Sequence, residues 1–236
     1  LPAHYRTVLL RRLIGIYFVE NITGTGIADY VLSADDEIYS ILILNPISLR
    51  MSISELLTYK DDTNFSFGDD TYELEIEVSG GYPGLLYILA HECTHIVDYV
   101  DRITPYVEPN MFSLFGTSKG NTDFTDECWS GYYEPKTPLA YREKLKFYWT
   151  KEDERIPSGE LPHVYAELET SPFVSLYSYL SWAEDLAEYC AMYHLTQNLG
   201  LTYSISLMRE GVPLFEYRPL DNPLVLGRAA HLGFLP

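Results

Sequence analysis

Two histidines four positions apart, in the stretch "YILAHECTHIVDYV" over residues 87–100, have the residue types and spacing that metal chemistry needs. At about 100° per residue on a helix, His91 and His95 lie about 40° apart on one face, one turn apart along the axis. Both imidazoles can then reach one ion, and Glu92 flanks that face, where a carboxylate can take a proton from metal-bound water. The spacing predicts the metal-binding helix of a hydrolase.

The apolar flanks of this helix argue against the alternative, in which its polar residues only make hydrogen bonds in a core. Such a helix should be buried, and buried ionisable groups need a compensating partner, which a metal ion supplies. Cys93, about 200° from His91, should pack away from the ion. Asp98 shares the face of His91 but lies about 10 Å further along the axis. It is either a hydrogen-bond acceptor for His95 or an ordinary aspartate near the helix end.

A third ligand must come from elsewhere, and two candidates compete. Asp101 follows His95 by six residues, the spacing of metzincin proteases, but that arrangement needs a glycine where this chain has Asp98. In a continuing helix, Asp101 also faces away from the ion. We therefore favour Glu184, in the stretch "YSYLSWAEDLAEYCAMYH".

Glu184 and Glu188 are four residues apart and share a helix face, with the small Ala187 between them. One carboxylate can bind the ion while the other braces a ligand histidine. If the helix runs through, Tyr177 projects about 20° from Glu184 into the same cavity, and Tyr179 faces elsewhere. The alternatives are a solvated acidic stripe and, for Tyr177, coincidence in a chain with 21 tyrosines.

These residues resemble the gluzincin metallopeptidases. His91, Glu92 and His95 match the first motif of that group, and Glu184 matches the glutamate that a later helix supplies. The run E-D-L-A-E with a tyrosine seven residues upstream is similar to anthrax lethal factor and related secreted peptidases. The resemblance implies one catalytic Zn²⁺ on His91, His95 and Glu184, with Glu92 as general base and Tyr177 stabilising the oxyanion or assisting the leaving group.

Composition limits the class of protein. With 236 residues, 47% hydrophobic and 21% charged, the chain is expected to form one globular domain. Its formal charge of −18 argues against nucleic acid as a partner. No run of about 20 apolar residues predicts a transmembrane segment. The three cysteines lack C-x-x-C spacing and are interpreted as mostly buried thiols: Cys93, Cys128 and Cys190.

The surrounding sequence predicts the elements that must position these residues. The first half is expected to hold a helix over 3–14, a strand over 15–20, two strands within 28–46, a helix over 52–60 with Ser52 and Glu55 as a capping box, and a strand over 71–78. The second half is expected to hold an irregular segment over 103–137, a helix over 138–149, a solvated linker over 151–160, a long helix over 175–200, a β segment over 202–217 and a short terminal helix.

We therefore expect an α+β, zincin-like catalytic domain over 1–236. A lobe of about 1–102 would hold a small N-terminal sheet and the active-site helix, and a mainly helical lobe of about 103–236 would supply Glu184. The cleft between them would bind an extended peptide or protein substrate along a sheet edge. The expected function is a zinc metallopeptidase. The alternatives are a non-catalytic zinc-stabilised binding domain and a zinc hydrolase of a non-peptide amide or ester.

The chain opens on Leu1-Pro2 without a methionine, as after removal of a leader or in a shortened chain. A soluble, secreted or extracytoplasmic protein is the expectation.

Overall fold

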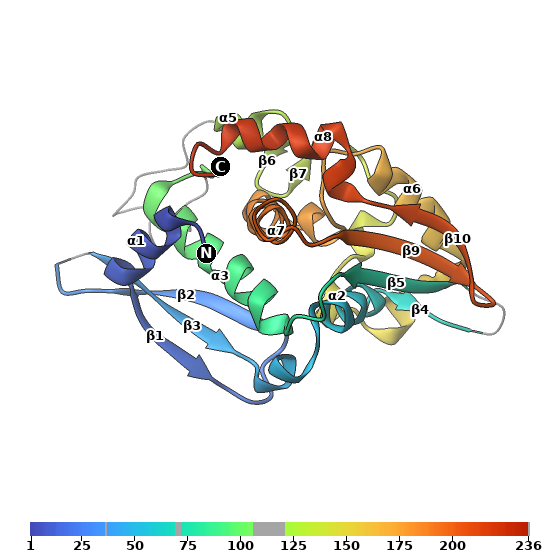
Figure 1. The fold of residues 1–236 in the computed structure, drawn as a ribbon, viewed down its shortest axis with the longest axis horizontal. Helices are drawn as coiled ribbons and strands as arrows, with labels where there is room; N and C mark the ends of the chain where they lie inside the picture. The colour runs from blue at the N-terminus through green and yellow to red at the C-terminus, as the bar shows by residue number, and fades with distance from the viewer. Residues whose placement is uncertain (36, 69–71, 106–120, 236) are drawn as a thin grey trace.

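The computed structural model describes residues 1–35, 37–68, 72–105 and 121–235. Within them, two three-stranded sheets stand at opposite ends of the molecule, with helices between them (Figure 1). This mixture of helices and small sheets confirms the expected α+β class. None of the described helices is long and apolar enough to span a bilayer.

The first sheet has the spatial order β1 (Leu13–Phe18), β3 (Ile38–Leu44), β2 (Gly26–Leu32). β1 runs parallel to β3, and β2 runs antiparallel to it. Alternate residues of β3 are buried because one face of this sheet packs on α1 (Ala3–Arg12) and α3 (Gly84–Asp101). Because β3 is the central strand of this sheet, β2 is an edge strand, and it lies beside α3 (Figure 1).

The second sheet combines the two halves of the chain. Its order is β10 (Val212–Tyr217), β9 (Tyr203–Arg209), β5 (Glu73–Val78), and β5 pairs antiparallel with β9. Main-chain hydrogen bonds thus cross the lobe boundary expected near residue 102. The helix α2 (Ile53–Asp62) packs on β5 and links this sheet to the centre of the molecule.

The elements expected in the first half are confirmed within two residues. In the capping box, Ser52 Oγ accepts a hydrogen bond from Glu55 N at 3.2 Å, and the Glu55 carboxylate accepts one from Ser52 N at 2.7 Å. These two bonds satisfy backbone donors that the first turn of α2 would otherwise leave unpaired.

The helix predicted over 138–149 is wrong, since this stretch forms only two short 3-10 turns. Asn64, which is fully buried, explains the difference. Its side-chain oxygen accepts hydrogen bonds from Phe147 N at 2.7 Å and from Thr150 Oγ1 at 3.2 Å. These bonds offer the backbone an alternative to helical pairing.

The linker predicted over 151–160 is partly structured. It contains β8 (Ile156–Pro157), which pairs in parallel with β4 (Phe65–Ser66). The helix α6 (Leu161–Glu169) follows it and was not predicted. The polar composition of 151–160 indicated a solvated linker and did not reveal this short strand. The strand pairs with β4, which follows α2 directly in the chain.

The long helix predicted over 175–200 is divided into three parts. A 3-10 turn (Tyr177–Tyr179) precedes α7 (Trp182–Tyr193), and a π-helical turn (His194–Asn198) follows it. The break has a local cause, because Ser181 Oγ accepts a hydrogen bond from Glu184 N at 3.2 Å and caps a new helix.

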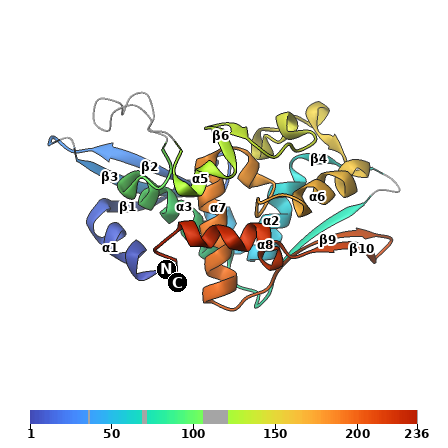
Figure 2. The same ribbon diagram turned by 90° about the horizontal axis from the view of Figure 1, so that it is seen from above.

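In the centre of the molecule, α7 packs against α3 between the two sheets (Figure 2). A buried ion pair between Asp185 of α7 and Arg228 holds α7 in place. Asp185 also accepts a hydrogen bond from Trp129 Nε1 at 2.8 Å. The remaining short elements are α5 (Asp123–Asp126), β6 (Trp129–Gly131), β7 (Glu134–Pro135), α8 (Pro223–Leu226) and further 3-10 turns. Residues 106–120 of the irregular segment expected over 103–137 lie outside the described residues.

Candidate metal site

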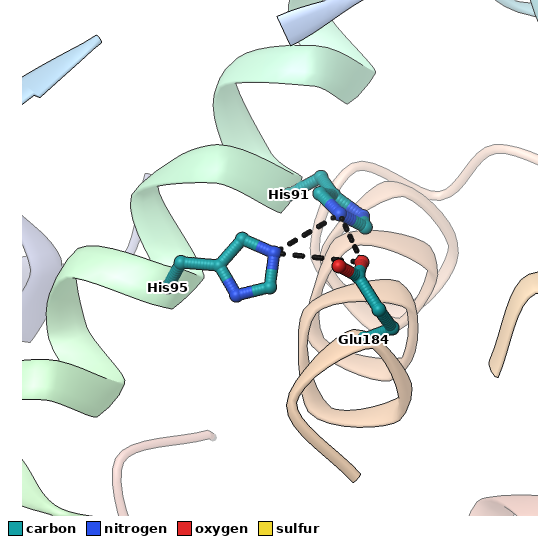
Figure 3. A group of neighbouring side chains, drawn as sticks. All are labelled: His91, His95 and Glu184. Atoms are coloured by element: carbon teal, nitrogen blue, oxygen red, sulfur yellow. Dashed lines mark hydrogen bonds and ion pairs between the residues drawn. The ribbon is translucent and has the colours of Figure 1, made fainter. Parts of the chain in front are cut away.

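Three side chains from two helices meet at one point. His91 and His95 project from α3, and Glu184 projects from the first turn of α7 (Figure 3). Glu184 Oε2 lies 3.1 Å from His91 Nε2 and 3.5 Å from His95 Nε2, and the two Nε2 atoms lie 3.3 Å apart. Tetrahedral ligands at about 2.1 Å from an ion stand about 3.4 Å from one another. The three atoms thus have the spacing of one face of a metal coordination sphere.

Glu188 lies behind this triangle and is completely buried. Its Oε1 atom is 3.0 Å from His91 Nδ1, an ion-pair contact that does not reach hydrogen-bond geometry. A carboxylate at this nitrogen favours a proton on Nδ1 and leaves the lone pair on Nε2, which faces Glu184 and His95. The orientation suits metal binding, as expected for a residue that braces a ligand.

The charges of the site call for a cation. Burial lowers the pKa of His91, but the carboxylates of Glu184 and Glu188 outweigh it and raise that pKa to about 10. Metal binding would displace the second ring proton of His91, because a metal ion binds the neutral imidazole. With both imidazoles neutral, these two glutamates and Glu92 oppose a single cation, Lys60, among the described residues that line the cavity or stand directly behind His91. Two negative charges remain, which a divalent ion would neutralise.

Glu92 is buried beside the triangle, under the start of β2. Burial raises the pKa of its carboxyl group, while the two histidines and a hydrogen bond from the Ala28 backbone lower it and leave a net rise. Gly26 makes this approach possible, because a Cβ atom there would stand 2.9 Å from Glu92 Oε1. The edge strand and the carboxylate are thus held in direct contact.

A cavity of about 350 Å³ opens over the triangle, between β2, α3 and the start of α7. Tyr177 lines it, with its ring centre 5.9 Å from that of His91, although the helix expected to carry it there is interrupted. Its hydroxyl has no hydrogen-bond partner among the described side chains. Tyr179 instead is buried against Phe173 and is not part of the cavity wall.

Lys60 is a site residue that sequence reasoning missed. Its Nζ atom donates to Glu188 Oε1 at 3.0 Å and to the Tyr87 hydroxyl at 2.5 Å, and it lies 4.4 Å from the centre of the Tyr177 ring. The sequence could have indicated Lys60 by its position in the helix over 52–60, because it follows the apolar Leu57 by three residues and so lies on the apolar face. A charge on that face needs a buried partner.

The other candidate residues lie away from the triangle of His91, His95 and Glu184. Asp98 accepts hydrogen bonds from Thr104 N at 2.7 Å and Thr104 Oγ1 at 2.6 Å, and among the described residues it accepts none from His95. Asp101, the last residue of α3, pairs with His4. Cys93 packs in the cluster of α1, α3 and β3, and it and the other two cysteines are free and buried.

Comparisons of this chain with protein-family models, with curated proteins and with solved structures find no match. Its chemistry must therefore be argued from the site. Two imidazoles and a carboxylate that can hold a metal ion, with a buried second carboxylate beside them and an open cavity above, can activate water for attack on a bound substrate.

Proposed function

We propose that the protein is a zinc-dependent metallopeptidase of the gluzincin type, built on a zincin-like arrangement of sheet edge, histidine helix and glutamate helix. The observation that carries the proposal is the triangle of His91, His95 and Glu184 with Glu92 beside it. Two histidines and one carboxylate form a ligand set that catalytic zinc uses, and bound zinc supplies a Lewis acid for water and for the scissile carbonyl.

The residues of this chain have separate tasks in the proposed hydrolysis. Glu92 accepts a proton from the attacking water and passes it to the leaving amine. Tyr177 donates its free hydroxyl to the oxygen that gains negative charge in the transition state. Glu188 holds His91 in orientation, and Lys60 balances the charge of Glu188. Each side chain is held by a helix or by the 3-10 turn before α7.

The edge strand β2 supports a peptide as the substrate. Residues 23–28, which lead into and begin this strand, line the cavity beside the triangle. Among the described residues β2 is an edge strand of its sheet, and an extended peptide can pair with such an edge beside residues 23–28, with its scissile carbonyl toward the triangle. A purely structural zinc site, in contrast, would have four protein ligands, whereas the described residues bring three together.

The test compares Glu92→Gln with wild-type protein and with Glu73→Gln, a change on an exposed strand position. Wild-type protein and the control should bind one zinc ion and cleave peptides in a randomised mixture analysed by mass spectrometry. Glu92→Gln should keep its zinc and lose about 10² to 10⁴ in rate, because the amide cannot accept the proton.

Three other outcomes would oppose the proposal. Equal turnover by Glu92→Gln would remove the general base. Zinc in the wild-type protein without hydrolysis of any peptide would favour a zinc-stabilised binding domain. Hydrolysis restricted to non-peptide amides or esters would favour a different class of zinc hydrolase.

A further inference from the structure

A second cavity lies beside the metal cavity. It has a volume of about 270 Å³ and is lined by residues of the segments 22–25, 45–51 and 147–155 and by α2. The two cavities share four lining residues: Thr23, Gly24, Thr25 and Tyr148. A ligand that lies along the chain leading into β2 can therefore extend from one cavity to the other.

Arg155 is the one charged residue among the described residues that line this second cavity. Its guanidinium has no hydrogen bond or ion pair within the described chain, and its Nε atom is buried without a partner. The adjacent Glu154 does not serve it, because Glu154 pairs with Lys146 at 2.7 Å. Arg155 as a whole is only half-buried, and its terminal amino groups, which also have no partner within the described chain, are not buried in the same way. A ligand can therefore pair with these amino groups through charge-assisted hydrogen bonds.

The polar groups that line this cavity favour a negatively charged occupant. The Tyr148 hydroxyl is buried without a hydrogen bond of normal geometry, and the Thr25 side chain lies beside it. The Asn45 amide, by contrast, already donates to the carbonyl oxygens of Ile22 and Gly24. No carboxylate lines the cavity among the described residues. The cavity thus presents donors and a positive charge without a counter-ion.

The position of Arg155 is held by the backbone on both sides. Asn64 fixes Phe147 and Thr150, and its carbonyl oxygen accepts a hydrogen bond from Ile156 N at 2.8 Å. Strand β8, which begins directly after Arg155, pairs with β4. A ligand therefore meets a guanidinium whose backbone is already ordered, which reduces the entropy lost on binding.

We propose that this cavity is a subsite in which Arg155 binds a carboxylate of the substrate. The group is an acidic side chain or the carboxylate at the end of a peptide whose backbone lies along residues 23–28. A planar carboxylate fits a guanidinium, and one cation in a chain of charge −18 suits a monoanion better than a phosphate. The assignment of the carboxylate to a substrate rests on the proposed peptidase function, whereas carboxylate binding does not.

The first experiment observes Arg155 directly in the zinc-loaded full chain. The ¹⁵Nε–¹Hε resonance of Arg155, assigned by its absence in Arg155→Lys, is followed during titration with blocked glutamate, N-acetylglutamate N′-methylamide. Blocked glutamine and sodium chloride are the controls. We expect a saturable shift with blocked glutamate alone. No shift with it, or the same shift with chloride, would overturn the subsite.

The second experiment measures cleavage of randomised peptides by wild-type protein, Arg155→Gln, Arg155→Glu and Lys151→Gln. Lys151 is an exposed neighbour outside the cavity, so its change controls for net charge. Wild-type protein and the control should prefer Asp or Glu at one position, or a free C-terminus over an amidated one, which separates the two sources of the carboxylate. Arg155→Gln should weaken this preference about tenfold or more, and Arg155→Glu should favour Lys or Arg there.

The two proposals can fail separately. Cleavage without an acidic preference, or with the same preference in Arg155→Gln, would overturn the subsite and leave the peptidase standing. A saturable shift of Arg155 without cleavage of any peptide would keep the carboxylate site and remove the peptidase.

Discussion

His91 is the residue at which the candidate metal site meets a buried polar network. On one side its Nε2 atom faces Glu184 and His95, and on the other its Nδ1 atom faces Glu188. Glu188 in turn accepts hydrogen bonds from Lys60, Tyr87 and, at 2.7 Å, Ser175. The orientation of one ligand therefore depends on side chains from several elements.

Glu184→Ala should release zinc, because it removes one of three protein ligands. Asp101→Ala should retain zinc, since Asp101 pairs with His4 and lies away from the triangle. Metal content after dialysis, measured by atomic emission, checks both variants. Full zinc in Glu184→Ala would contradict the ligand assignment, and loss of zinc in Asp101→Ala alone would point to the metzincin arrangement instead.

Lys60→Met should destabilise the fold by about 3 to 5 kcal/mol and weaken zinc binding about 10- to 100-fold, because Glu188 would remain buried without its cation. Combining it with Glu188→Gln should recover much of the stability, since the buried charge is then gone. Urea denaturation of the zinc-free protein and chelator competition measure the two effects, with the exposed Lys151→Met as control. Strictly additive effects of the two changes would show that Lys60 does not act through Glu188.

At the scale of elements, the contact between β2 and α3 brings a strand edge to the proposed general base. Gly26 permits it, because a Cβ atom at that position would meet Ile88 Cγ2 at 2.8 Å as well as Glu92. Both distances are shorter than ordinary van der Waals contacts. If residue 26 has a side chain, either β2 or the contacted side chains of Ile88 and Glu92 must move.

Gly26→Ala should shift β2 or Glu92, lower the stability by about 1 to 3 kcal/mol and reduce peptide hydrolysis, with zinc retained on ligands that do not touch Gly26. Gly159→Ala is the matched control, since a Cβ atom there would meet no atom within 4 Å. Denaturation midpoints, zinc content and kcat/KM compare the two variants. Full activity and stability in Gly26→Ala would show that the contact has no such role.

At the scale of the whole molecule, the candidate metal site joins parts of the chain that are far apart in sequence. Its ligands come from α3 and α7, which pack at the centre, while β5 and β9 join the two halves again at one end (Figures 1 and 2). A bound ion would cross-link the central helices. Unfolding must then release the metal, so metal binding and global stability are coupled.

Zinc should therefore raise the unfolding temperature, with about 4 kcal/mol of added stability when free zinc exceeds its dissociation constant a thousandfold. A chelator should reverse the effect. Thermal unfolding followed by circular dichroism measures it, and Glu184→Ala is the control that should respond weakly. The same unfolding temperature with and without zinc in the wild-type protein would contradict a metal that joins α3 and α7.

Sequence patterns predicted the first half of the fold well and the second half less well. The capping box of Ser52 and the alternation of the strand over 71–78 depend on residues that are close together in the chain. Such patterns can be read from the sequence without knowledge of the tertiary contacts. The stretch 138–149 has a helical pattern, but Asn64 binds its backbone from a distant position. Ser181 divides the helix predicted over 175–200, which shows that one side-chain cap can outweigh an apolar period.

The sequence by itself determined that His91 and His95 share a helix face with Glu92 beside them, because helix geometry depends only on spacing along the chain. It also indicated Glu184 as a partner, through the pattern of a second helix. Only the tertiary structure decided that Glu184 reaches both histidines, that Lys60 compensates a buried glutamate, and that Arg155 lines a neighbouring cavity. These contacts depend on how distant elements pack, and no local period encodes that packing.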